Sequence, residues 1–190
     1  IDPYNPRKKV GYYKWVAKNV DGLVEEPFVD NIDDKYARIY FILHSYQDAY
    51  SKQEFNKSWD YAAELLSNHF DKMFDQSGST EDKAIEIASQ HTDQLDKAKQ
   101  IYNFVKSEIK LGDHTTLWGD EFKMPEKVLE HREGSSSEKN MLLINMFRHA
   151  GMDAKPLFVS TRSHGYVIQD FVEYAQFNRL ICKLRINKKD

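Results

Sequence analysis

The stretch from residue 133 to residue 152, EGSSSEKNMLLINMFRHAGM, constrains the fold more than any other part of the chain. It predicts a helix that is apolar on nearly all sides, and such a helix is buried in a core. Its apolar residues include Leu142, Leu143, Ile144, Met146 and Phe147. Ser135 and Glu138 have the spacing of a capping box, which predicts where the helix starts. Gly151 predicts where it ends.

The segments around this helix predict an α+β fold. Gly11–Val20 and Ala37–Tyr46 are rich in aromatic and β-branched residues, so we expect strands there. From about Lys52 the apolar period becomes helical, and strands return at 154–162 and 176–186. Because the helices precede the last strands rather than alternate with them, we expect helices packed on an antiparallel sheet.

The predicted helices have recognisable starts. Ser79 or Thr80 can cap one of them through its hydroxyl. Thr92 or Asp93 can cap the next in the same way. Pro125 stands where a first-turn proline opens a short helix. These signals predict a set of short helices ahead of the buried one.

The last predicted strand has a clear two-residue period. One face carries Leu180, Cys182, Leu184 and Ile186, and the other carries Arg179, Ile181, Lys183 and Arg185. Cys182 therefore belongs to the apolar face. We expect it to be an inert core residue rather than a reactive thiol.

Composition excludes several classes of function. A net charge of −3 with interspersed signs offers no basic surface for nucleic acid. No apolar run approaches the roughly 20 residues that span a bilayer. The single cysteine allows neither an internal disulfide nor a cysteine-built zinc site. We expect no metal and no cofactor, since the acidic residues Asp30, Asp33 and Asp34 lack the glycine turn of a calcium loop.

The serines from Ser135 to Ser137 raise the question of catalysis. The N-terminus of a helix favours negative charge and would lower the pKa of a cysteine placed there. A serine hydroxyl gains much less, because it needs a positioned base to take its proton. Catalysis by Ser136 would therefore require a histidine opposite it.

The segments KVLEHREGSSSEKNMLLINMFRHAGMDAKPLFVSTRSHG and QFNRLICKL resemble the core of bacterial transglutaminase-like proteins, which are relatives of papain-type cysteine peptidases. In that family a Gly-Asp-Cys-Lys-Asp-Lys block opens an apolar helix, and strands of the form Pro-x-Leu-Val-Ser-Thr-Arg and Phe-Asn-His-Ala-Ile follow. The upstream stretch YKWVAKNVDGLVEEPFVDNIDDKYARIYF resembles the end of a β-rich domain often found before this core.

This resemblance implies a division of the chain into two parts. Residues 1–50 would be the last strands of the β-rich domain, and residues 51–190 a C-terminally truncated transglutaminase-like core. The chain begins with Ile1 rather than methionine, so we expect a piece of a longer or processed protein. Proteins with this pair of domains are usually exported, which implies the periplasm or the cell surface.

The family's motifs place Ser136 in the catalytic cysteine slot and Arg179 in the histidine slot. The third catalytic residue, an Asp on the following strand, would lie at or beyond the end of the chain. An arginine stays protonated and cannot act as a general base. The resemblance therefore implies a fold whose catalytic triad is dismantled and whose Ser136 and Arg179 do not catalyse a reaction.

Three functions remain open, and the first is a non-catalytic module that binds a peptide or glycan, or acts as a scaffold. Arg179, the hydroxyls of Ser135, Ser136 and Ser137, and the helix N-terminus would together favour an anionic group. The cleft could be lined by Trp118, Tyr166 and Tyr174.

The second function is a hydrolase or acyltransferase that uses Ser136 as nucleophile, with another histidine as base. His164 is the first candidate, because the neighbouring Gly165 could let its loop reach the cleft, and His114 is the second. The third function is purely structural, as a spacer in a longer envelope protein, and it predicts a cleft filled by side chains.

Overall fold

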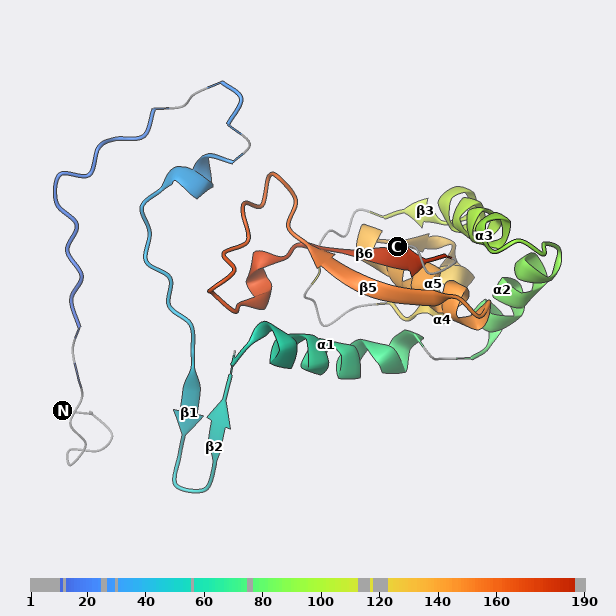
Figure 1. The fold of residues 1–190 in the computed structure, drawn as a ribbon, viewed down its shortest axis with the longest axis horizontal. Coiled ribbons are helices and arrows are strands. Elements are labelled where there is room, and N and C mark those ends of the chain that lie inside the picture. The colour runs from blue at the N-terminus through green and yellow to red at the C-terminus, as the bar shows by residue number, and fades with distance from the viewer. Residues whose placement is uncertain are drawn as a thin grey trace.

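The computed structural model describes residues 11, 13–24, 27–29, 31–55, 57–74, 77–112, 117 and 123–186. Its elements (Figure 1) are η1 (Ile32–Lys35), β1 (Ser45–Gln47), β2 (Lys52–Glu54), α1 (Trp59–Phe74), α2 (Ser79–Ser89), α3 (Gln94–Glu108), β3 (Lys110–Leu111), α4 (Pro125–His131), β4 (Glu133–Gly134), α5 (Ser136–His149), β5 (Asp153–Val159), η2 (Tyr174–Gln176) and β6 (Arg179–Arg185). This is the predicted α+β arrangement of helices on an antiparallel strand pair.

Helix α5 is the centre of the fold. It contacts all four other α-helices and both strands of the β5–β6 pair, and α1 and α3 lie on opposite sides of this central layer (Figure 1). Its buried apolar side chains are Met141, Leu142, Leu143, Ile144, Met146 and Phe147. The prediction of a buried helix is therefore confirmed.

Both ends of α5 have the predicted caps. At its start, the Ser135 hydroxyl accepts from the Glu138 amide and the Glu138 carboxylate accepts from the Ser135 amide. At its end, Gly151 has a φ of 75°. The Met152 amide donates to Phe147 O at 2.9 Å. This hydrogen bond and the one donated by the Gly151 amide together form a Schellman motif. Because each cap uses only residues near in sequence, the sequence predicts both.

Strands β5 and β6 form an antiparallel pair whose register runs from Asp153 opposite Arg185 to Val159 opposite Arg179. Leu180 is fully buried, and the even-numbered residues after it pack against the core, while Ile181 is exposed. The predicted two-residue period of β6 is confirmed.

The start of α2 differs from the prediction. Ser79 and Thr80 lie inside the helix, and the N-cap position belongs to Gly78, whose φ is 144°. The capping acceptor is Glu126 of α4, whose carboxylate accepts from the Ser79 hydroxyl at 2.5 Å and from the Thr80 amide at 2.9 Å. A Cβ on Gly78 would lie 2.8 Å from Glu126 Oε1, so a residue with a side chain would displace the cap.

The other predicted helix starts are confirmed. The Asp93 side chain accepts from the Asp96 amide and caps α3. Pro125 is the first residue of α4. In both cases the residue types near the helix start were sufficient to predict where the helix begins.

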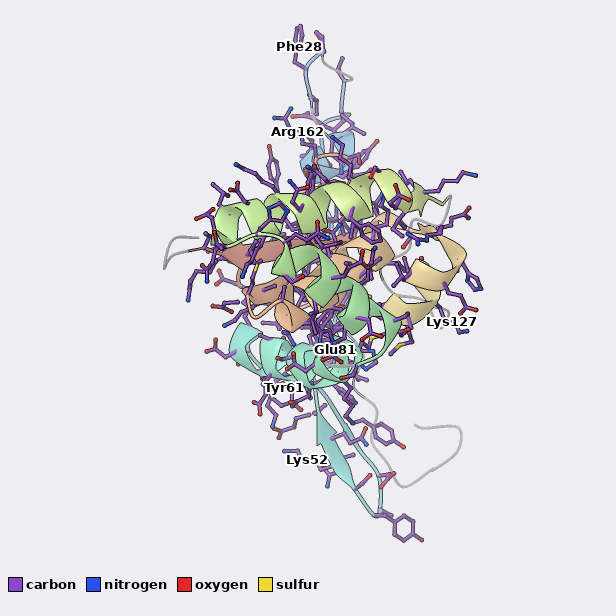
Figure 2. All side chains as sticks on the ribbon, turned by 90° about the vertical axis from the view of Figure 1, so that its right-hand side faces the viewer. Phe28, Lys52, Tyr61, Glu81, Lys127 and Arg162 are labelled. Carbon is purple, nitrogen blue, oxygen red and sulfur yellow. The ribbon has the colours of Figure 1, made fainter. Side chains whose placement is uncertain are left out.

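The N-terminal region contains less strand than predicted. No described residue of Gly11–Val20 is in a strand, and Ala37–Tyr46 enters one only with its last two residues. A strand needs a hydrogen-bonded neighbour, and within the described part of residues 11–55 the one strand pair is β1 with β2. Figure 2 shows Phe28 and Lys52 at opposite ends of the molecule, both projecting away from the layered core.

The described part of the chain contains no helix that is both long enough and apolar enough to cross a bilayer.

We expect Glu126→Gln to lower the free energy of unfolding by about 1–2 kcal/mol at pH 7, because it weakens the cap of α2. Burial raises the pKa of Glu126, but hydrogen bonds from Ser79 and Thr80 outweigh it and hold the pKa below its ordinary 4.5. A lowered folded pKa stabilises above pH 4.5, and this contribution is lost as the pH falls through the folded pKa. Urea unfolding at several pH values measures this difference.

The matched control is Glu130→Gln on the same helix, where the carboxylate forms only an exposed ion pair with Lys127. Its effect should be clearly smaller than that of Glu126→Gln. Equal effects of the two substitutions would show that Glu126 is not the cap.

Candidate functional site

The first turn of α5 is joined directly to β6. The Ser137 hydroxyl accepts a hydrogen bond from the Leu180 amide at 3.4 Å. One turn on, Asn140 Oδ1 accepts from the Cys182 amide at 3.1 Å, and Asn140 Nδ2 donates to Ser136 O at 2.9 Å. These bonds use β6 amides that point away from β5, so they hold the helix start against the free side of the strand.

The glycine before the serines is required by close packing. A Cβ on Gly134 would lie 3.0 Å from Val128 Cγ1 and 3.2 Å from Glu138 Cβ. Glu138 is itself 4% exposed, and its Oε1 accepts from the Lys123 amide at 2.8 Å while its Oε2 accepts from the Ser135 amide at 2.7 Å. Both of its carboxylate oxygens are therefore occupied by backbone amides.

The three serines have different roles. Ser135 and Ser137 are buried, and their hydroxyls accept backbone hydrogen bonds. Ser136 is partly exposed at the first position of α5, and its hydroxyl forms no hydrogen bond with the residues that the structure describes. Of the three hydroxyls, that of Ser136 is the one left for a ligand.

Arg179 is the first residue of β6 and lies opposite Val159 of β5. Its side chain is partly buried, and its Nη1 donates to Asn178 O at 2.7 Å. The bond between Ser137 and Leu180 brings the start of β6 to the start of α5. The elements that carry Ser136 and Arg179 therefore meet at this point.

The residues before Arg179 close the loop between β5 and β6, the 160–178 loop. Asn178 Oδ1 accepts from the Thr161 amide at 3.0 Å, and Asn178 Nδ2 donates to Thr161 Oγ1 at 2.9 Å. Phe177 packs edge-on against Trp59 of α1, with the ring centroids 5.6 Å apart. Both motif residues thus have structural roles.

The His164 side chain is held by a hydrogen bond to the backbone of the 160–178 loop, to which it belongs. His164 Nε2 lies 2.9 Å from Ala175 O, and because a carbonyl oxygen only accepts, this nitrogen must be the donor. Within the loop, Gln176 Oε1 accepts from the Ile168 amide at 2.7 Å. A role of His164 as base would therefore fall to its Nδ1.

The N-terminal region reaches the same loop (Figure 1). The Tyr166 amide donates to both carboxylate oxygens of Asp34, at 3.1 and 3.2 Å. Gly165, with a φ of 113°, allows this approach, since a Cβ there would lie 2.5 Å from Asp34 Oδ1. Asp34, one of the acidic residues considered above as calcium ligands, therefore anchors the loop.

The structure separates the aromatic cleft candidates. Tyr166 lines a hollow of about 390 Å³ together with His164. Tyr174 lines a different hollow of about 520 Å³, between α1 and β5. Ser136 lines neither of these two hollows. Two further candidates, His114 and Trp118, lie outside the described residues.

Two polar groups on α5 were not predicted. Asn140, which joins Ser136 to Cys182, stands just before the apolar run, and its polarity at a buried helix start was the available signal. Lys139 donates to Ile109 O, and burial lowers its pKa. No local pattern could have named these distant partners.

Cys182 behaves as predicted from its strand face. Burial raises the pKa of its thiol to about 12, although the Arg148 charge opposes this. The thiol therefore stays protonated at neutral pH. Among the described residues, no group of three His, Cys, Asp or Glu side chains is placed to hold a metal ion.

Comparison with known proteins matches this arrangement to one family. The model of the Transglutaminase-like superfamily matches residues 81–177, from α2 to the end of the 160–178 loop. The chain belongs to this superfamily. The matched region contains Ser136 and stops two residues before Arg179. No curated protein sequence matches the chain.

A crystal structure from Parabacteroides distasonis, of a protein described as a proposed protease, is similar to this transglutaminase-like chain. The TM-score is 0.54 and the sequence identity 20%, and the match covers 64% of this chain. It covers 24% of the other protein, so this chain spans about a quarter of that protein's length. The similarity supports the fold.

We expect the three serines to differ in their effect on stability. Ser135→Ala removes the cap of α5, and Ser137→Ala leaves a buried amide without its acceptor, so each should lower the free energy of unfolding by about 1 kcal/mol. Ser136→Ala should change it by less than about 0.5 kcal/mol. Urea titration of the three variants gives the comparison. A large loss for Ser136→Ala would contradict the assignment of its hydroxyl.

Cys182 should react slowly with iodoacetamide in the folded protein. At pH 8 the rate should be at least about a hundredfold lower than in the unfolded chain, because only the thiolate reacts. The rate should keep rising with pH toward the raised pKa of about 12. Mass spectrometry with and without guanidinium measures both rates, and rapid labelling of the folded protein would contradict a buried thiol.

Proposed function

We propose that this chain contains a non-catalytic transglutaminase-like module that binds the anionic end of a peptide or glycan at the first turn of α5. The observation that carries the proposal is that the three serine hydroxyls differ in their hydrogen bonds. Ser135 and Ser137 serve the fold, and Ser136 alone presents a hydroxyl with no partner among the described residues.

The proposal of a non-catalytic site is supported by the residue types at the family's catalytic positions. A serine nucleophile requires a base that accepts its proton. Arg179 in the histidine slot cannot accept one. His164 is fastened to Ala175 O through its Nε2 and belongs to a loop with its own internal bonds. A binding role does not require either residue to act as a base.

An anionic ligand suits the charges at this place. The amides of the first helical turn attract negative charge, and the positive charge of Arg179 would add to this attraction. The nearest acidic side chain on α5, Glu138, is buried and bonded to the amides of Ser135 and Lys123. Its two oxygens therefore do not compete with a ligand for the Ser136 hydroxyl.

We also propose that residues 1–50 are the last strands of a preceding β-rich domain, and that the protein is exported to the periplasm or cell surface. The N-terminal region exposes large apolar side chains that a neighbouring domain would cover. Its exposed aromatic residues are Tyr13, Trp15, Phe28, Tyr36, Tyr40, Phe41, Tyr46 and Tyr50. Trp15 and Phe41 pack edge-on with their ring centroids 5.2 Å apart, so the two segments lie side by side although neither residue is in a strand.

The binding proposal predicts that peptides with a free C-terminal carboxylate bind more tightly than their amidated forms. Arg179→Ala should weaken the binding of the free acid about tenfold, and Ser136→Ala about threefold. Arg185→Ala is the matched control, since it lies on the same strand and pairs with Asp153. Isothermal titration with peptide and acidic glycan panels measures these affinities. Equal affinity for acid and amide, or no effect of Arg179→Ala, would contradict the proposal.

Labelling with a fluorophosphonate separates this proposal from the enzyme alternative. We expect no adduct at Ser136. An adduct that His164→Ala or His114→Ala abolishes would instead show a serine-dependent hydrolase or acyltransferase. Intact-mass analysis of the protein and the two variants gives the result.

A further inference from the structure

Helix α1 is fastened to the rest of the protein at both of its ends. At its start, the Trp59 indole Nε1 donates to Gln169 O at 2.6 Å and the ring packs against Phe177. Near its end, Asp71 accepts from Arg148 of α5 at 3.0 Å. These contacts hold the helix in place and leave its middle turns beside β5.

Between these fastenings lies a hollow of about 520 Å³, the α1–β5 hollow. Its middle is lined by Ala62, Ala63 and Leu66 of α1 and by Pro156, Leu157 and Phe158 of β5. Two alanines in succession keep the helix side of the hollow open. Its size and mainly apolar lining are those of small-molecule sites.

The edge of β5 beside the hollow is closed to an added peptide strand. The Ala154 amide donates to Met152 O, and Ala154 O accepts from Arg148 Nε, both at 3.0 Å. Pro156, two residues on, has no amide proton to donate. A peptide could not form a regular ladder along this edge, so the occupant must be held by its apolar surface instead.

The charged residues that line the hollow are Asp71, Arg148 and Lys155, and because Asp71 pairs with Arg148 their net charge is positive. In the β5–β6 register Lys155 stands directly opposite Lys183. Like charges directly opposite each other on a sheet destabilise it. The next pair on that face is Leu157 and Ile181, which are 44% and 39% exposed. An anion in the hollow would be attracted by the positive charge of Lys155.

We propose that the α1–β5 hollow binds a small anionic amphiphile, with its apolar chain or ring in the hollow and its carboxylate or sulfonate beside Lys155. The occupant is a free small molecule rather than a peptide, because the β5 edge offers no ladder. This site is separate from the first turn of α5 and does not depend on the function proposed for it.

The test uses the whole 190-residue chain with 1-anilinonaphthalene-8-sulfonate as fluorescent probe and decanoate as competitor. Ala63→Phe fills the hollow from an exposed helix position and should lower the affinity for the probe at least about tenfold. Asn68→Phe is the matched control, because it places the same ring on an exposed α1 position that does not line the hollow. It should leave the affinity unchanged.

The charge is tested by Lys155→Gln, which should weaken decanoate about fivefold while leaving the neutral ligand decan-1-ol unchanged. Lys155→Arg should restore decanoate binding. Thermal melting shows that each variant folds. Ser136→Ala and Arg179→Ala should bind the probe normally, which separates this site from the α5 site.

Three results would overturn the proposal. One is equal probe affinity in Ala63→Phe and the parent chain, and another is a Lys155→Gln effect that is the same for the acid and the alcohol. The third is a dimer that Ala63→Phe dissociates on size-exclusion chromatography without any decanoate binding. That last result would assign the hollow to a second copy of the chain.

Discussion

The hydrogen bonds between the first turn of α5 and the outer edge of β6 are the constraint on which the rest of this structure depends. Ser137 and Asn140 accept from the Leu180 and Cys182 amides, which β5 does not use. They join the buried helix to the sheet at one end, while the core packs along its length. They also fix where Ser136 stands, so the candidate site is a consequence of how the helix and sheet are joined.

The sequence could predict what short-range geometry decides. The capping box, the Schellman motif at Gly151 and the alternation in β6 each involve residues a few positions apart. The cap of α2 could not be predicted, because its acceptor is Glu126, 46 residues further along the chain. The strands expected in Gly11–Val20 failed for a related reason: residue type favours a strand but does not provide its partner.

The candidate site could likewise be predicted only where sequence motifs determine it. The serines at the helix start and Arg179 at the start of β6 follow from motif positions, and the structure brings their elements together. The cleft aromatics did not follow, since Tyr166 and Tyr174 line separate hollows. Whether a side chain reaches a given surface depends on the path of the 160–178 loop, and that path is set by Asn178, Gln176 and Asp34.

The different duties of the three serines have an evolutionary consequence. A residue whose side chain supports the fold can change only at a cost in stability, and Ser135 and Ser137 are residues of that kind. The side chain at position 136 does not support the fold, so selection can act there on the chemical function of the side chain alone. A lineage can therefore exchange a nucleophile for a binding group at this position, or the reverse, while the helix and sheet around it stay as they are.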